Sequence, residues 1–119
     1  MTHPLLFEFG MGTSLRRGDY TEAAVRAVKD ALWRNSINLA ELFDFPKEAM
    51  QITLHVAVAV PDAVDHDALR AVFPYGNVTV EVTKGGLDVP RPAAQPGSGQ
   101  PTVIANATIA VGFDMEEVS

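Results

Sequence analysis

The sequence predicts an α+β (mixed α/β) domain in which a single four-stranded mixed sheet carries two helices on one face. Four segments alternate apolar and polar residues, which is the period of a β-strand. Two segments repeat apolar residues at helical spacing. Taken in order, these segments give the pattern strand, helix, strand, helix, strand, strand.

The first predicted strand covers residues 5–11, with Phe7, Phe9 and Met11 on one side and Glu8 on the other. Gly10 and Gly12 are expected to end it. A helix over residues 20–35 follows, because Asp19 and Glu22 have the spacing of a capping box. The apolar positions of this helix are mostly small, which suits close packing against a sheet: Ala24, Ala27, Val28, Ala31 and Leu32.

The remaining elements alternate in the same way. Residues 39–45 are expected to form one helical turn, and residues 51–60 give the clearest strand pattern. A short helix over 66–73, capped by Asp65, precedes a third strand over 77–83 and a fourth over 102–113. Residues 90–101, rich in Pro, Gly and Ser, are expected to be a flexible loop.

The connections predict how the strands are arranged. Two helical crossovers leave the first three strands parallel, whereas the final loop permits an antiparallel pair. Both helices then lie on one face, and the other face is uncovered. It could be solvated, covered by a different protein, or buried between copies of this chain, and the last interpretation is favoured because its residues are small and only partly polar: Glu8, Thr53, His55, Ala57, Thr79, Glu81, Thr83, Asn106 and Thr108.

Composition sets limits on function. The 119 residues are expected to form one domain over 1–119, and the absence of Cys excludes disulfides and thiolate ligands. A net charge of −6 without a basic run argues against nucleic-acid binding. No segment has the length of a membrane helix and no export signal is visible, so a cytoplasmic protein is expected, without metal or organic cofactor.

The densest positive charge lies in a glycine-rich turn before the first helix. Backbone N–H groups at a helix N-terminus attract anions, and arginine forks suit carboxylate or phosphate. The alternative is a tight turn with solvated arginines. If the first three strands are parallel, the turn and the segment after the third strand meet at one edge of the sheet. The predicted ligand-binding set combines the two regions: Gly10, Gly12, Thr13, Ser14, Arg16, Arg17, Lys84 and Gly85.

His55 is the candidate catalytic residue. It lies in the middle of the second strand, where Glu8 and Glu81 are expected on the same face, and imidazole is the side chain best suited to proton transfer near neutral pH. A hydrogen-bonded histidine in an interface is the competing interpretation.

The segments FGMGTSLRRGDYTEAAVRAVKDALWRNS and VTVEVTKGGLDVP resemble the Lin-type family of conserved hypothetical proteins. The family's glycine-x-glycine-x-aspartate-x-histidine-glycine signature is kept at Gly10 and Gly12, but Ser14, Arg16 and Arg17 replace its last three fixed residues. The order of elements is also similar to the trimeric chorismate-mutase-like and the cyanuric-acid-hydrolase-like architectures, which implies a homotrimer.

Together these features predict a homotrimeric, cofactor-free isomerase or hydrolase that acts on a small carboxylate or cyclic polar metabolite between subunits. The alternative is a non-catalytic binding or assembly protein.

Overall fold

The computed structural model describes residues 2–15, 17–33, 51–73, 76–90 and 101–114, and the predicted turn over 39–45 lies outside these residues. Its elements in chain order are β1 (Thr2–Ser14), α1 (Tyr20–Trp33), β2 (Gln51–Val58), the 3₁₀ turn η2 (Pro61–Ala63), α3 (His66–Arg70), β3 (Asn77–Lys84), β4 (Leu87–Val89) and β5 (Thr102–Asp114).

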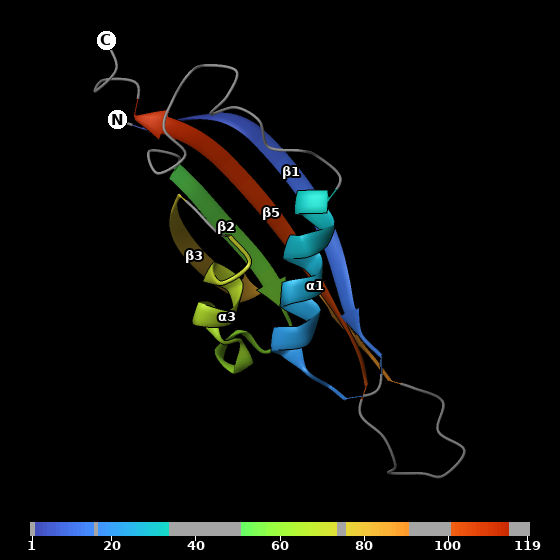
Figure 1. Ribbon diagram of the computed structural model, residues 1–119. Coiled ribbons are helices and arrows are strands. Elements are labelled where there is room, and N and C mark those ends of the chain that lie inside the picture. The colour runs from blue at the N-terminus through green and yellow to red at the C-terminus, as the bar shows by residue number, and fades with distance from the viewer. Residues whose placement is uncertain (1, 16, 34–50, 74–75, 91–100, 115–119) are drawn as a thin grey trace.

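The strands form one mixed sheet in the order β1-β5-β2-β3 (Figure 1). β5 runs antiparallel to both β1 and β2, and β3 runs parallel to β2, so β1, β2 and β3 share one direction. The mixed α+β class with two helices is therefore confirmed. The last strand is antiparallel, but it lies between β1 and β2 and not beside β3.

The predicted four strands were too few, because β4 is a fifth. It pairs with the start of β5, from Leu87 opposite Ile104 to Val89 opposite Thr102. β5 pairs with β2 farther along, so β4 continues the line of β2 on the same edge of β5. Only three residues long, β4 offers no alternation for a sequence pattern to detect.

Two glycines allow the chain to pass from β3 into β4. Gly85 crosses the end of β2, where its N–H donates to the carbonyl of Val58 at 2.8 Å. Gly86 has a φ of 61°, and a Cβ there would lie 2.3 Å from the carbonyl oxygen of Ile104. A residue with a side chain would therefore prevent this close approach.

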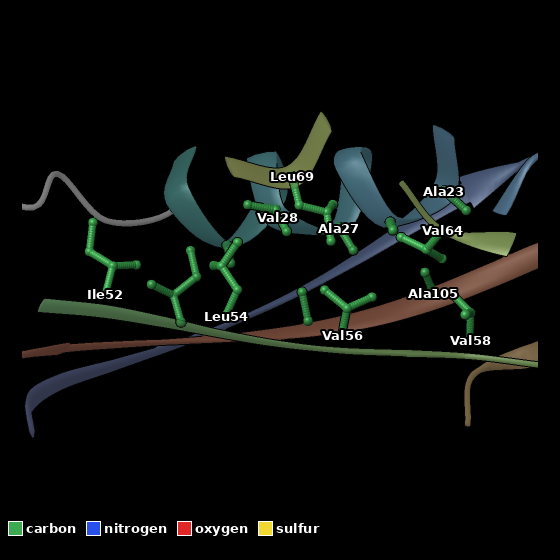
Figure 2. Close-up of a cluster of buried hydrophobic side chains, with 14 of the residues drawn as sticks. Ala23, Ala27, Val28, Ile52, Leu54, Val56, Val58, Val64, Leu69 and Ala105 are labelled. Carbon is green, nitrogen blue, oxygen red and sulfur yellow. The ribbon is translucent and has the colours of Figure 1, made fainter. Parts of the chain in front are cut away.

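The core lies between the sheet and the helices. In Figure 2, Ile52, Leu54, Val56 and Val58 of β2 point toward α1 and α3, where Leu69 faces them. β5 contributes its odd-numbered residues to the same layer, and α1 contributes a stripe of small residues. The buried members from these two elements are Val103, Ala105, Ala107, Ile109 and Val111 of β5, and Ala23, Ala24, Ala27, Val28 and Ala31 of α1.

The faces of β1 are reversed relative to the prediction. Glu8 pairs with Ile109, a core residue, so Glu8 lies on the helix-covered side. Phe7, Phe9 and Met11 lie on the side without helices and are 56%, 66% and 55% exposed. β1 also continues to Ser14, beyond the glycines that were expected to end it. The orientation follows from α1, which packs so closely on β1 at Gly10 and Gly12 that a side chain has no room there.

Candidate functional site

Within the described residues one side of the sheet carries no helix; this side is called the open face here, and it has a small hollow. Its volume is about 250 Å³. It lies over β2, β3 and β5, which are neighbours in the sheet. Ala57 stands between Thr83 of β3 and Asn106 of β5, and its short side chain leaves room between longer neighbours. The lining residues are His55, Ala57, Thr83, Asn106, Ala107 and Thr108.

His55 is held within this hollow by a specific contact. Its Nε2 lies 3.0 Å from the Oγ1 of Thr83. Thr83 follows two residues after Glu81, the residue of β3 that pairs with His55. Glu81 is directly beside His55 in the sheet, and Thr108 is opposite it on β5. The threonine hydroxyl can donate or accept, so it accommodates either tautomer of the ring. The hollow thus combines a proton-transfer group with neutral donors and acceptors.

The surroundings of the hollow are poor in charge. Among the open-face positions whose side chains the structure describes, Glu81 is the one charged residue. Depletion of charge with exposed aromatic and Met side chains is the composition of a buried interface core. The open-face positions whose side chains the structure describes are Phe7, Phe9, Met11, Thr13, Gln51, Thr53, His55, Ala57, Asn77, Thr79, Glu81, Thr83, Leu87, Val89, Thr102, Ile104, Asn106, Thr108, Ala110 and Gly112.

The predicted anion site forms a second hollow, between β1 and α1. Its volume is about 260 Å³, and Leu15, Arg17, Glu22 and Arg26 line it. Glu22 forms ion pairs with both arginines: its Oε1 lies 2.8 Å from Arg26 Nη1, and its Oε2 lies 3.8 Å from Arg17 Nη1. The carboxylate therefore offsets part of the positive charge that was expected to attract a ligand.

Asp19 already occupies the N-terminus of α1. Its Oδ1 accepts the N–H of Glu22 at 3.0 Å, and its carbonyl accepts the N–H of Ala23 at 3.1 Å. Asp19 is in turn tied to Ser14, whose Oγ accepts the Asp19 N–H at 3.2 Å. Ser14 is fully buried, so its hydroxyl holds the turn together. Arg16 lies outside the described residues.

Gly10 and Gly12 lie within β1 beneath α1. A Cβ on Gly10 would lie 2.2 Å from the carbonyl oxygen of Ala27, and one on Gly12 would lie 2.2 Å from the Ala27 nitrogen. Two glycines two residues apart, facing a stripe of alanines, are thus explained by helix packing. Thr13 contributes its carbonyl, which accepts from Arg26.

The second half of the predicted set lies near the open-face hollow. A Cβ on Gly85 would be 2.8 Å from the Cβ of Ala57, so Gly85 borders the floor of the hollow. Lys84 is exposed at the end of β3 and belongs to the lining of neither hollow. Within the described residues, the structure thus places Gly85 beside the His55 hollow, whereas Thr13, Ser14 and Arg17 cluster at the β1–α1 turn.

Sequence reasoning did not select Asn106, Thr83 and Thr108 as site residues. The period-two pattern placed them on the uncovered face, but their convergence on His55 depends on strand order and register, which a single sequence does not contain. It also missed the pair of Tyr20 and Asp88, in which the phenol donates to the carboxylate Oδ2. The other carboxylate oxygen, Oδ1, is buried without a hydrogen-bond partner.

The pKa of Tyr20 is raised above its usual value of 10.0, first by this hydrogen bond, then by burial and by the charge of Asp88. The pair connects the first turn of α1 to β4, close to the β1–α1 turn. In the described part of the chain, no group of three or more His, Asp or Glu side chains is arranged to hold a metal ion. Likewise, none of the helices there is both long enough and apolar enough to span a bilayer.

A single mixed sheet, with the described helices on one side and a small hollow on the other, defines a small α+β protein. The chain belongs to a conserved hypothetical protein family (Lin0512_fam), whose model matches residues 4–111. The predicted family resemblance is confirmed, whereas the similarity to chorismate-mutase-like and cyanuric-acid-hydrolase-like architectures stays a prediction.

The chain is also similar to a solved structure, an FtsZ-like protein of unknown function from Nostoc punctiforme. The two share 30% sequence identity and superpose with a TM-score of 0.84, over 95% of this chain and 97% of that one. None of the curated proteins matches the chain.

Proposed function

We propose that this chain is a homo-oligomeric protein that binds a small polar metabolite in the His55 hollow, with another copy covering the open face. A homotrimer is the form expected from the sequence. The observation that carries the proposal is the open face itself, where exposed apolar side chains and few charges lie around the His55 hollow.

The energetics of the open face favour a cover. Burying a Phe or Met side chain contributes about 1.5–3 kcal/mol. Phe7, Phe9 and Met11 are each more than half exposed in the single chain, so covering them is worth about 1 kcal/mol or more apiece. Contiguous exposed apolar surface of this kind is typical of interaction sites.

The lining of the hollow indicates the chemistry of the ligand. Its described residues include neither Lys nor Arg, and they offer an amide, two hydroxyls and an imidazole. Such a set pairs with a neutral polar molecule better than with a strong anion. With about 250 Å³ available, the ligand is smaller than a drug-sized molecule.

In the catalytic form of the proposal, His55 transfers a proton during a cofactor-free isomerisation or hydrolysis, and Thr83 orients the ring through its hydrogen bond at 3.0 Å. In the non-catalytic form, the same contact fixes the ring as a ligand donor or acceptor. Turnover assays on any ligand found separate the two forms.

The second candidate is binding of a small carboxylate at the β1–α1 turn, which the two guanidinium groups of Arg17 and Arg26 around one hollow favour. Thr13 and Ser14 then act by holding the turn. The pairing of both arginines with Glu22 weakens this candidate relative to the open-face hollow.

A thermal-shift experiment with succinimide and succinate distinguishes the sites, because the two probes are similar in size but differ in charge. A ligand that binds the folded state raises its stability by RT ln(1 + [L]/Kd). We expect succinimide to raise the melting temperature, and Asn106→Ala to abolish that rise while Arg17→Ala preserves it. Stabilisation by succinate alone, lost in Arg17→Ala, would move the site to the turn. No stabilisation by either probe would favour assembly without a ligand of this class.

A further inference from the structure

β1 is an edge strand of the sheet, and its outer main-chain groups are a potential site for pairing. The N–H of Met11 leaves the sheet and donates to a side chain of α1, so the main chain of Met11 points away from β5. Because this direction alternates along a strand, Phe7, Phe9 and Thr13 present their N–H and C=O groups on the same outer side. Unpaired edges of this kind are templates for pairing with another chain.

The composition of β1 favours pairing of this edge with β1 of a second copy of the chain. The stretch LLFEFGMGTS, residues 5–14, has one charged residue, Glu8, and is rich in large apolar side chains. Segments with high strand propensity and low charge self-associate edge to edge unless they are protected. Every other copy in solution presents the same strand in the same exposed form.

Two side chains of α1 cover the middle of this edge. Asp30 Oδ2 accepts the N–H of Met11 at 3.0 Å, and Arg26 Nη1 donates to the carbonyl oxygen of Thr13 at 2.8 Å. The spacing matches, because four residues of helix rise about 6 Å and two residues of strand about 6.7 Å. α1 runs antiparallel to β1, so each side chain reaches the residue opposite it.

We propose that Asp30 and Arg26 form an edge guard, which prevents β1 from pairing with β1 of a second copy and leaves the open face as the route of self-association. The guard works by occupying one donor and one acceptor that an incoming strand needs. Its two side chains carry charges of opposite sign, so they cover the edge without adding net charge. This inference does not depend on what occupies the His55 hollow.

The test compares two double variants that make the same chemical change. Asp30→Ala/Arg26→Ala removes the guard and keeps the net charge at −6. Asp67→Ala/Arg70→Ala removes an exposed ion pair of 3.0 Å on α3, away from β1, and serves as the matched control. Asp30→Asn/Arg26→Lys keeps an acceptor and a donor at the two positions and serves as the rescue variant.

Sedimentation velocity over a concentration series gives the outcome. We expect the guard variant to form particles larger than those of the wild type, at concentrations about ten-fold lower than the wild type needs. Amide hydrogen exchange at Phe9 and Met11 should slow as these particles form. The control and the rescue variant should behave as the wild type, whatever the size of the wild-type particle.

A folded guard variant with the wild-type dependence of mass on concentration overturns the inference. Far-UV circular dichroism establishes folding, and if the double variant does not fold, Asp30→Ala alone is measured with the same two outcomes. A monomeric wild type would contradict the proposed function but not the guard, because the guard variant would still be expected to associate.

Discussion

At Gly12 the main chain of β1 lies directly against the main chain of α1. An added Cβ would lie 2.2 Å from the Ala27 nitrogen and 2.3 Å from the Ala23 carbonyl oxygen, and neither backbone group can turn aside as a side chain could. We therefore expect Gly12→Ala to lower the free energy of unfolding by about 3 kcal/mol, the upper end of the range for overpacking. Urea unfolding measures this. Thr13→Ala, one residue away and on the open face, is the control, and equal stability of the two variants would contradict the packing account.

Tyr20 makes a prediction about alkaline pH. Its pKa is raised above 10.0 in the folded chain, chiefly by the hydrogen bond to Asp88, so the folded state holds the phenol proton more tightly than the unfolded state. The stabilisation is complete below pH 10 and is lost as the pH rises through the folded-state pKa. We expect Tyr20→Phe to be less stable by about 1–2 kcal/mol at pH 8 and to lack this alkaline step. Urea unfolding between pH 8 and 11 tests it, and parallel curves for both proteins would refute the linkage.

The sequence indicates that the residues of the β1–α1 turn are important, but it does not distinguish ligand binding from helix packing as their role. Gly10, Gly12 and Ser14 stand out in the sequence as a candidate binding loop, yet in the structure they face α1, where two lack room for a Cβ and the third is buried. The signal that distinguishes the uses is the alanine stripe of α1, which is complementary to glycines on a strand. His55 could be selected as a candidate for proton transfer, and its Thr83 contact could not, because it depends on the register of β2 and β3.

At the scale of elements, α1 begins where the sequence indicates. Asp19 caps it through the N–H of Glu22 at 3.0 Å. Replacing an N-cap carboxylate with a methyl group costs about 1 kcal/mol, so Asp19→Ala should lower the unfolding free energy by about that amount. Guanidinium unfolding measures the change, and Asp62→Ala on the η2 turn is a comparison variant with the same loss of charge. Equal effects of the two substitutions would show that the cap contributes nothing beyond its charge.

The strands differ in how far the sequence predicts them. β2, β3 and β5 alternate along their whole length, because one side carries the aliphatic residues that face the helices and the other carries mostly polar or small residues, so their faces follow from the pattern. β1 alternates as well, but its large apolar residues lie on the open face. The usual assumption that such residues face the core therefore predicts the two faces of β1 the wrong way round. β4 has three residues and depends on Gly85 and Gly86 to bring it beside β5, which no local pattern reveals.

At the scale of the whole molecule, the two sides of the sheet differ in kind. The helix-covered side is filled by aliphatic residues, whereas the open face combines exposed Phe and Met with threonines and the hollow at His55. The sequence predicts that one side lacks helices, because the two helical crossovers between parallel strands place both helices on the same face. It cannot predict that the apolar side of β1 joins that face, which is what gives the face the composition of an interface.

Phe9 is the most exposed of the large apolar residues of β1, so it is the position for a test of the face. A lysine there would bring an unpaired charge into the proposed contact between copies, where it is costly. We expect Phe9→Lys to weaken self-association by at least about ten-fold, which corresponds to 1.4 kcal/mol. Size-exclusion chromatography across concentrations measures this. Ala71→Lys, exposed after α3, is the control, and an equal response of the two variants would exclude the open face as the contact.

Sedimentation equilibrium of the unmodified chain at micromolar concentration shows whether copies cover the open face, because burial between copies requires more than one copy per particle. We expect a particle whose mass is a whole multiple of 12.8 kDa, with three chains in the expected trimer. A single species of 12.8 kDa over the whole concentration range would contradict it.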